Sequence, residues 1–420
     1  MLTADVHIGR QPSRIPVEHA QEFSSSNTWR GIVDLALRER VRAVIVAGDL
    51  VDTSNQFLEA AGALEDGLKR LREQDVAVIL TAGNHDVEVI PELARVAALD
   101  SLTVLGENGR WDSLTLPTEA GDISPQIFAW SFPRCENPGN PVAAFPREAV
   151  DISRPCLGIL HSDFGSPGSR YCGTSRTDFT GLPVDLWVIG HLHKPVLSAA
   201  DAPARILIPG SPQGMDPGPG EQGLHGVWIL DTADTAMTPV FAPVGGLCYD
   251  QVALDVSDIR APGDLPRRAR EAIADTLNGL CRTHPSLRAA HVRFVARGRS
   301  RMTRDQVATV LSETLSEPFE IDGILVFAHD YSVDVEPALD VAAMMEGKGV
   351  PALLARVAAG RIEEDERAWL AAAFSTYQAA VRDDRSFGDI GSDGAPPDVS
   401  LDMAAPRRWA LRLLEKVVGA

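Results

Sequence analysis

At residues 81–86 the chain reads Thr81-Ala82-Gly83-Asn84-His85-Asp86, directly after the apolar run of residues 76–80. An apolar run of this length, rich in β-branched residues, is typical of a buried strand. A glycine, an amide, an imidazole and a carboxylate then follow one another. Functional groups often lie on loops that a rigid sheet holds in place. The segment therefore predicts a functional site at the end of a buried strand.

The same pattern, a strand-like run followed by Asp, Asn or His, recurs within about the first half of the chain. It occurs at Asp5-Val6-His7, at Gly48-Asp49-Leu50-Val51-Asp52 after residues 44–47, at His161 after residues 157–160, and at Gly190-His191-Leu192-His193 after residues 186–189. One such motif is a modest signal. Their succession in one chain indicates a single site built from several strand ends.

The first of these motifs has little chain in front of it. Only Met1 to Ala4 precede Asp5, the residue that the first strand should present. Two explanations are open: the start codon is mis-assigned, or this first strand is an edge strand that is unusually brief.

The order of elements predicts a mixed α/β fold. Helices are expected over residues 28–40, where Thr28 can cap the first turn, and over residues 57–73. They alternate with the strands that lead to Asp49 and Asn84, which implies a parallel sheet with covering helices. Residues 102–196 are strand-like and loop-rich, and further strands are expected on both sides of a Gly/Pro-rich loop at residues 209–223. A two-sheet sandwich flanked by helices fits this pattern best.

The character of the chain changes near Tyr249. Strands are expected at residues 251–256, 291–296 and 324–327, and helices at residues 264–281 and 303–315, as in a small α+β domain. We therefore divide the chain into a site-bearing domain (1–248), an α+β cap domain (249–338), a helical region (339–384), a flexible linker rich in Gly, Asp, Pro and Ser (385–406) and a terminal amphipathic helix (407–420).

Composition limits the classes of function. The 420 residues carry 39 Lys and Arg against 58 Asp and Glu, a net charge of −19. This charge argues against indiscriminate binding to nucleic acid or anionic membranes. It does not exclude a nuclease, because local patches and bound cations can invert the local potential. The 5 cysteines are scattered without a CxxC pair, which favours reduced thiols in the cytoplasm. The sequence shows neither a secretory leader nor a bilayer-length apolar run, so no membrane association is expected.

The donor types at the strand ends indicate a metal site. Carboxylate, amide and imidazole groups together suit borderline divalent cations such as Mn²⁺ or Fe²⁺, whereas carboxylates alone favour Mg²⁺ or Ca²⁺ and thiolates favour Zn²⁺. A pair of such cations needs a bridging carboxylate, for which Asp49 is the natural candidate. Any one of the histidines taken alone could equally be a structural loop residue, but the whole ordered set favours metal binding.

These motifs resemble the signature of the calcineurin-like metallophosphoesterases. The resemblance rests on Asp5-x-His7, Gly48-Asp49-x-x-Asp52, Gly83-Asn84-His85-Asp86, His161 and Gly190-His191-x-His193, and it covers residues 1–215. Three further stretches are similar to the SbcD/YhaO-like DNA repair nucleases, relatives of the double-strand-break nuclease family. They are the segment from Thr3 to Arg10, Pro209-Gly210-Ser211-Pro212, and Glu221-x-Gly223-x-x-Gly226.

The resemblance implies a role for each motif residue. The first of two divalent metal ions, most simply Mn²⁺, would be held by Asp5, His7, Asp49 and His193, and the second by Asp49, Asn84, His161 and His191. His85 would lie beside the scissile phosphate without binding metal, and would stabilise charge or protonate the leaving oxygen. Asp52 would orient His85, although some family members carry a His there. Asp86 is open to either a site role or a loop-capping role, and Glu221 is expected to shape the substrate cleft without being catalytic.

The basic residues admit two interpretations each. Arg293, Arg297, Arg299, Arg301 and Arg304 form a basic run that either contacts DNA or is a solvated face. Arg10 and Arg14 either approach substrate phosphate or pair with local carboxylates. Of these we take Arg10, Arg14, Arg297, Arg299 and Arg301 as the DNA-contact candidates.

The function expected from the resemblance is a metal-dependent DNA exonuclease and endonuclease, the nuclease subunit of an SbcC–SbcD-like repair complex. DNA, a coiled-coil ATPase of the SbcC type and a second copy of the chain are the expected partners. The terminal helix would either dock on the ATPase or pack back on its own chain. The alternative function is a phosphoesterase that acts on small molecules or phosphoproteins with the same metals. A non-catalytic scaffold would lack some of the ligands, and here none is missing.

Overall fold

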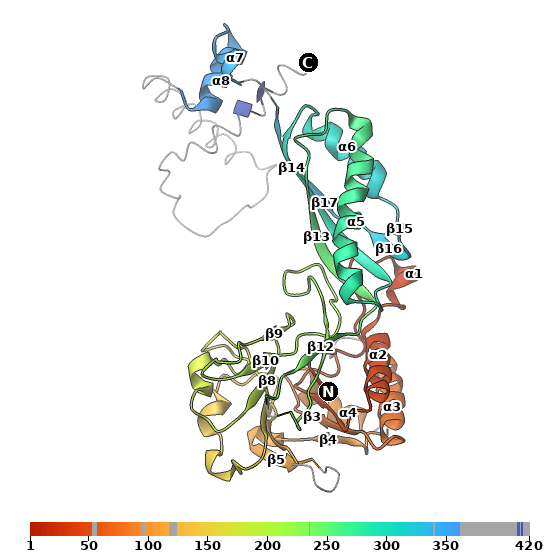
Figure 1. The fold of residues 1–420 in the computed structure, drawn as a ribbon, viewed down its shortest axis with the longest axis vertical. Coiled ribbons are helices and arrows are strands. Elements are labelled where there is room, and N and C mark those ends of the chain that lie inside the picture. Colours follow the sequence, from red (N-terminus) through yellow and green to blue (C-terminus); the bar gives the residue numbers. More distant parts are fainter. Residues whose placement is uncertain are drawn as a thin grey trace, which may run out of the picture. The chain divides into compact units, whose positions relative to one another are not determined.

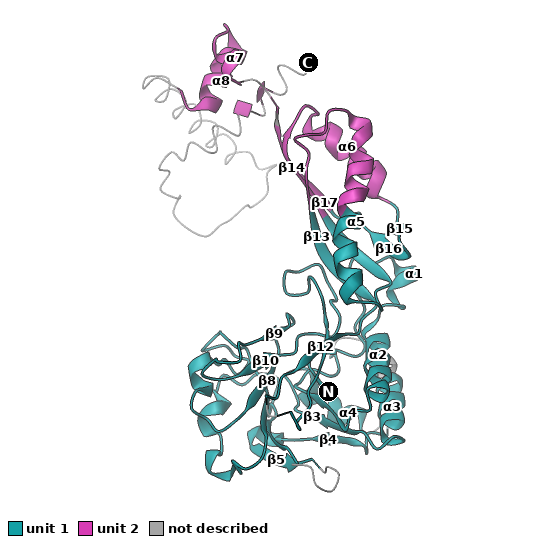
Figure 2. Cartoon of the chain, in the orientation of Figure 1, with its two compact units in different colours: residues 1–252, 273–293, 317–330 teal, residues 253–272, 294–316, 331–420 magenta. Residues whose placement is uncertain are grey.

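The computed structural model describes residues 1–52, 57–94, 98–116, 124–234, 236–338, 341–361, 410–411 and 413–414 (Figure 1). The chain divides into two compact units (Figure 2). The first unit comprises residues 1–252, 273–293 and 317–330, and the second comprises residues 253–272, 294–316 and 331–420. The domain limits expected from the sequence stay a prediction, and the linker predicted at residues 385–406 lies outside the described residues.

The first sheet carries the N-terminal part of the predicted site. In the described part of the chain it has six strands, in the order β12-β11-β1-β2-β3-β4. Their bounds are β1 (Leu2–Thr3), β2 (Ala43–Val46), β3 (Ala77–Leu80), β4 (Leu102–Val104), β11 (Gly226–Ile229) and β12 (Val240–Pro243). Strands β1 to β4 are parallel, whereas β11 is antiparallel to β1. Because parallel strands end at one edge, the segments that follow β1, β2 and β3 lie together.

The second sheet carries the C-terminal part of the site. Its strands, counted over the described residues, are six in the order β5-β6-β7-β8-β10-β9. Their bounds are β5 (Trp111–Thr115), β6 (Gln126–Trp130), β7 (Cys156–His161), β8 (Leu186–Gly190), β9 (Val196–Leu197) and β10 (Ile206–Ile208). The central strands β6, β7, β8 and β10 are parallel, and both edge strands are antiparallel to their neighbours. His161 pairs with Gly190, so β7 and β8 deliver their histidines at the same edge.

The two sheets form the sandwich that the sequence predicts. Their facing sides share one buried cluster, which includes Leu2, Ile45 and Ile79 from the first sheet and Ile159 and Val188 from the second. A strand that is buried on both faces of its sheet has a nearly continuous apolar sequence, so these strands could be recognised from the sequence.

Helices cover the outer face of the first sheet. Helix α2 (Ser25–Arg38) and helix α3 (Phe57–Arg72) run side by side (Figure 1) and bury Trp29 and Leu64 against Val44 and Val78. Helix α2 begins earlier than the predicted start at Thr28, because the Thr28 amide already donates to the Ser24 carbonyl at 3.0 Å. The unit also contains α1 (Val17–Ala20), α4 (Asp86–Leu93) and the 3-10 turns η1 (Glu107–Gly109), η2 (Pro141–Ala144), η3 (Arg147–Ala149) and η4 (Arg176–Phe179).

The α+β elements expected after Tyr249 are present. Over the described residues they form a five-stranded sheet with the order β13-β14-β16-β15 and with β17 paired to β14. The elements are β13 (Leu247–Asp255), η5 (Pro262–Asp264), α5 (Leu265–Thr283), β14 (Ala289–Ser300), α6 (Arg304–Leu315), β15 (Phe319–Ile321), β16 (Ile324–Phe327) and β17 (Tyr331–Pro337). Thr303 caps α6 in a capping box with Gln306. The sequence analysis missed β15 and β17.

The C-terminal region is described only in part. Helices α7 (Val341–Met345) and α8 (Val350–Ala359) lie within the predicted helical region. From the predicted terminal helix, the described residues Ala410 and Leu414 are buried in one cluster with Leu354 and Val357 of α8. The docking of this helix on an ATPase stays a prediction, and the rest of the predicted helix lies outside the described residues. None of the described helices has the length and apolar character needed to cross a membrane.

Candidate metal centre

The loops after β1 and β2 run side by side and bring the first predicted ligands together. The backbone amides of Asp5 and His7 donate to the carbonyls of Gly48 and Asp49, both at 3.0 Å. Asp5, His7 and Asp49 have φ angles of 52°, 48° and 51°. Such left-handed conformations are uncommon outside glycine, and they persist where the surroundings over-determine them, typically at functional sites.

Two glycines make room for the site. A side-chain carbon at Gly48 would overlap the imidazole of His161, and one at Gly83 would overlap the carboxylate of Asp49. Close approach of a side chain to the backbone therefore requires glycine at both positions. This packing explains why glycine precedes both the carboxylate motif and the amide motif in the sequence.

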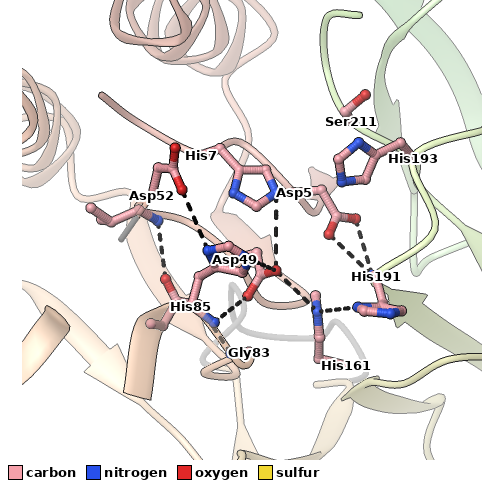
Figure 3. A network of polar contacts seen from close by, with 12 residues as sticks. Asp5, His7, Asp49, Asp52, Gly83, His85, His161, His191, His193 and Ser211 are labelled. Atoms are coloured by element: carbon pink, nitrogen blue, oxygen red, sulfur yellow. Dashed lines mark hydrogen bonds and ion pairs between the residues drawn. The ribbon is translucent and has the colours of Figure 1, made fainter. Parts of the chain in front are cut away.

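Asp49 is the central carboxylate (Figure 3). Its Oδ2 atom lies 3.3 Å from Nε2 of His161 and 3.9 Å from Nε2 of His7. Its Oδ1 atom accepts the backbone amide of His85 at 3.0 Å. Burial alone would raise the pKa of Asp49, but the surrounding imidazoles, His161 above all, outweigh it and hold that pKa well below its usual range. An ionised carboxylate among imidazoles is suited to bridge two cations.

The potential ligand atoms gather in two groups around Asp49. Asp5, His7 and His193 form one group, and Asp49, His161 and His191 form the other, with the ligand atoms of each group within 4.8 Å of one another. A third grouping of the same kind, His7 with Asp52 and His85, shares His7 with the first.

The hydrogen bonding of this region also fits cations. Among the described residues, both ring nitrogens of His7 and Oδ1 of Asn84 are buried without a hydrogen-bond partner. Buried polar atoms are normally paired, and an unpaired one calls for an explanation such as an ion. The donor set of carboxylate, amide and imidazole is the one expected for a pair of borderline divalent cations. The structure therefore gathers six of the seven predicted ligands in an arrangement that fits two such ions, and these are Asp5, His7, Asp49, His161, His191 and His193.

His161 and His191 meet at the ends of β7 and β8. Nδ1 of His161 lies 3.0 Å from the Ala47 carbonyl, so this nitrogen carries the proton and Nε2 faces Asp49. Nδ1 of His191 lies 3.2 Å from that Nε2, and the His191 amide donates to both Asp5 carboxylate oxygens at 3.1 Å. Burial opposes a charge on His161, but Asp49 outweighs it and raises the pKa of His161 to about 9. Burial, with the charge of His161, lowers the pKa of His191 to about 4.

Burial disfavours the charged forms of both Asp5 and His7. Burial raises the pKa of Asp5 to about 6, although His161 and His193 act in the opposite direction. Burial also lowers the pKa of His7 to about 4. A cation at this position would stabilise the ionised carboxylate and use the neutral imidazole as a ligand.

His85 lies beside the ligands and is backed by Asp52. Nδ1 of His85 is 3.4 Å from Oδ1 of Asp52, and its Nε2 is 4.0 Å from Oδ2 of Asp49. The hydrogen bond to Asp52 raises the pKa of His85, against the effect of burial. The His85 side chain keeps 34% of its surface exposed, so it can reach a bound substrate.

Asp86 has a structural role that settles its open assignment. It is fully buried, and its two carboxylate oxygens accept the backbone amides of Val51 and Gly83, each at 3.0 Å. It therefore ties the loop after β2 to the loop after β3. Burial, with the nearby charge of Asp49, raises the pKa of Asp86 to about 7.

Sequence reasoning missed a partner of a predicted ligand. Glu221 is buried, and its carboxylate accepts a hydrogen bond from Nδ1 of His193. Burial opposes the ionised form, but the bond to His193 outweighs it and lowers the pKa of Glu221. The Glu-x-Gly motif was a signal for this residue, but the sequence assigned it only to the shape of the cleft.

The predicted DNA-contact arginines are placed in both units. In the first unit, Arg10 pairs with Asp216 at 3.2 Å, and Arg14 is exposed. In the second unit, Arg297, Arg299 and Arg301 are exposed on or just after β14. Arg299 pairs with Glu336 at 3.8 Å, and Arg297 lies opposite Asp334 in the register of β14 and β17.

Residues 1–195 match the family described as calcineurin-like phosphoesterase. This part of the chain is a metallophosphoesterase domain, in a family that hydrolyses phosphoesters at a dinuclear metal site.

Among curated proteins, the chain is 27% identical over 238 residues to the "uncharacterized metallophosphoesterase YhaO" of Bacillus subtilis (strain 168), a match that covers 55% of each chain. It is 32% identical over 230 residues to the "DNA double-strand break repair protein Mre11" of Sulfolobus acidocaldarius, covering 50% of this chain and 53% of that protein. The match therefore spans about half the length of each of these relatives.

Among solved structures, the chain is similar to the protein TT1561 of Thermus thermophilus, with 12% identity, a TM-score of 0.36 and coverage of 58% of this chain and 96% of that one. A dimetal phosphatase from Danio rerio shows 14% identity, a TM-score of 0.34 and coverage of 54% and 90%.

Proposed function

We propose that this chain is a metal-dependent DNA nuclease that hydrolyses phosphodiester bonds. The observation that carries the proposal is the partly exposed His85, backed by Asp52 and adjacent to the clustered ligand atoms around Asp49. Hydrolysis of a phosphodiester needs charge neutralisation, an activated water and a proton for the leaving oxygen. Cations held by these ligands would supply the first two, and His85 would supply the third. The relatives named as double-strand break repair proteins support DNA as the substrate.

Two divalent cations, which we propose to be Mn²⁺, would activate water and neutralise the phosphate oxygens when bound. The chain's own groups then have distinct tasks. Asp5, Asp49 and Asn84 supply oxygen ligands from the first sheet. His7 adds an imidazole from the same sheet, and the histidines of the second sheet complete the set. His85 donates a proton from its ring to the leaving oxygen, with Asp52 holding the ring in place. Asp86 keeps the two loops that carry Asp49 and Asn84 in register.

The partners expected from the sequence are part of the proposal. The nuclease would act as a homodimer with a coiled-coil ATPase of the SbcC type, in the cytoplasm. All five cysteines are free, which fits a reducing compartment. The ATPase would bind the terminal segment, residues 407–420.

A second function, a phosphoesterase for small molecules or phosphoproteins, also has specific support. Arg299 is paired with Glu336 and Arg10 with Asp216, and the net charge is −19. Paired arginines on an acidic chain attract DNA less than free ones do.

The experiment is cleavage of end-labelled duplex DNA in Mn²⁺ by wild type and His85→Ala, with hydrolysis of bis-p-nitrophenyl phosphate in parallel. We expect wild type to cut both substrates, and His85→Ala to lose DNA cleavage while still binding metal. Glu22→Gln, which alters an exposed ion pair with Arg288, is the matched control and should cleave like wild type. Hydrolysis of the small ester alone would favour the second function instead.

A further inference from the structure

The side chain of His193 is held from the side opposite the proposed cations. Its Nδ1 atom is bonded to Glu221, so Nε2 is the nitrogen left to serve as a ligand. The ring lies 5.3 Å from that of His7, centroid to centroid, and its ligand atom gathers with those of Asp5 and His7. Figure 3 shows His7 and Asp5 to the left of His193 and Ser211 above it.

Glu221 itself is fixed by other contacts. Its Oε2 atom accepts the Ser211 hydroxyl at 3.3 Å and the Met215 amide at 3.1 Å. The Met215 carbonyl accepts in turn the Ser13 amide at 2.8 Å and the Tyr249 hydroxyl at 3.3 Å. Only 5% of Glu221 is exposed. The carboxylate is therefore anchored by two donors besides His193, and its position does not depend on the imidazole.

We propose that Glu221 is a positioning residue for the first metal: it holds the imidazole of His193 in the tautomer and orientation that present Nε2 as a ligand. The inference rests on the dinuclear centre of the proposed function. A metal-ligating histidine normally donates its other ring N–H to a carboxylate or carbonyl, which fixes the tautomer and makes the ligand more basic. His161 uses the Ala47 carbonyl for this purpose, whereas His193 uses Glu221.

The difference between these two partners makes the inference specific. A charged carboxylate strengthens its imidazole as a ligand more than a neutral carbonyl does. Loss of the carboxylate should therefore weaken the site that contains His193 and leave the site that contains His161 and His191 unchanged. If Glu221 had only a structural role, its substitution would weaken both metal sites together, or it would lower the free energy of unfolding without changing metal affinity.

The test is a titration of Mn²⁺ into metal-free protein, followed by calorimetry and by electron paramagnetic resonance. For Glu221→Gln we expect one class of sites at wild-type affinity and the other weakened by about 10-fold to 100-fold. At limiting Mn²⁺ the spin-coupled signal of a metal pair should give way to that of a single ion. Glu221→Asp keeps the charge on a shorter side chain, and should bind the weaker ion more tightly than Glu221→Gln does.

Wild-type affinity for both ions in Glu221→Gln would overturn the inference, and so would equal weakening of both. If Glu221→Gln does not fold, Glu221→Asp decides: selective weakening of one ion supports the inference, and unchanged binding of both rejects it. Glu22→Gln serves as the control carboxylate variant here as well. If the wild-type protein binds a single ion, the proposed dinuclear centre is wrong, and the inference about Glu221 fails with it. Failure to cut DNA with two bound ions would count against the nuclease only, and would leave the role of Glu221 standing.

Discussion

Nδ1 of His161 lies 3.0 Å from the carbonyl oxygen of Ala47, which is 114 positions earlier in the chain. This hydrogen bond joins the end of β7 in the second sheet to the loop after β2 in the first. It directs Nε2 of His161 toward Asp49 at 3.3 Å. The contact that closes the sandwich at this edge therefore also orients a predicted metal ligand.

Removal of single ligands should reduce metal binding in a graded way. We expect His161→Ala to bind one Mn²⁺ and Asp49→Asn to bind none tightly, because Asp49 alone belongs to both predicted ligand sets. Phosphodiester cleavage should fall by about 10³-fold or more in both variants, since two metals together stabilise the attacking and leaving oxygens. Equilibrium dialysis with metal analysis gives the stoichiometry. Two bound ions in Asp49→Asn would contradict the bridging role.

His85 and Asp52 should act as a pair. We expect His85→Ala to lower kcat by about 10²-fold to 10⁴-fold, the usual contribution of a general acid. Asp52→Asn should lower it less, by about 10-fold to 100-fold, because the imidazole remains but loses its orienting carboxylate. Both variants should bind metal like wild type. If the double variant is no slower than His85→Ala alone, Asp52 acts through His85. If the two substitutions reduce kcat independently, Asp52 has a role of its own.

Two glycines allow a matched test of packing at the site. Gly48 and Gly165 have similar φ angles, +90° and +95°, but a Cβ would overlap His161 at Gly48 and meets nothing within 4 Å at Gly165. We expect Gly165→Ala to cost about 1 kcal/mol of unfolding free energy, the backbone term alone. Gly48→Ala should cost a further ~1–3 kcal/mol from overpacking. Urea unfolding measures both, and equal losses would contradict the close approach of His161.

His291 should make stability depend on pH. It is fully buried between the rings of Tyr249 and His329, with Arg14 and Asp330 as the other charged groups nearby. Burial lowers its pKa to about 4 in the folded chain. The unfolded chain, with a pKa of about 6.5, therefore takes up the proton first as the pH falls.

The stabilising contribution of neutral His291 is thus complete above about pH 6.5 and is lost progressively toward pH 4. At pH 5 the loss should amount to about 2 kcal/mol, given about 1.4 kcal/mol per pH unit. His291→Leu should remove this part of the pH dependence. The measurement is urea unfolding of both proteins at pH 7.5 and pH 5. Because His7 and His191 titrate in both proteins, the difference between the two isolates His291, and a constant difference would refute the assignment.

The arginine predictions can be separated by salt dependence. Arg10→Ala should lower DNA affinity for all sequences alike and reduce the slope of log affinity against log salt by about 1, if Arg10 contacts a phosphate. Arg299→Ala should change the slope less, because Arg299 already pairs with Glu336. Fluorescence anisotropy with duplex DNA, measured without divalent cations so that the proposed metal-dependent cleavage does not occur, gives both slopes. An unchanged slope in Arg10→Ala would remove it from the predicted DNA contacts.

Much of the first unit was accessible from the sequence. Strands β2, β3, β7 and β8 are short apolar runs buried on both faces, and each ends in a polar motif. Parallel strands share an edge, so it followed from pattern alone that the loops carrying Asp49 and Asn84 lie side by side. The approach of His161 was decided by the packing of the second sheet on the first. The first strand, Leu2–Thr3, was expected at an edge of the sheet, but it lies between β11 and β2.

Other features depended on contacts between distant parts of the chain. Strand β17 alternates apolar and polar residues, and it was missed because its pairing partner, β14, lies more than thirty residues earlier. The ion pair of Arg299 with Glu336 follows from that pairing and could not be read from the basic run by itself.

The same holds for the supports of the metal centre. Spacing along a strand predicts where a ligand emerges, because the geometry of a strand is local. It does not predict which group approaches the far side of that ligand's ring. Glu221 reaches His193 from 28 positions away, and Asp86 reaches Val51 from 35. The metal ligands could therefore be predicted from the sequence motifs. The groups that orient these ligands were determined only by the folded loops.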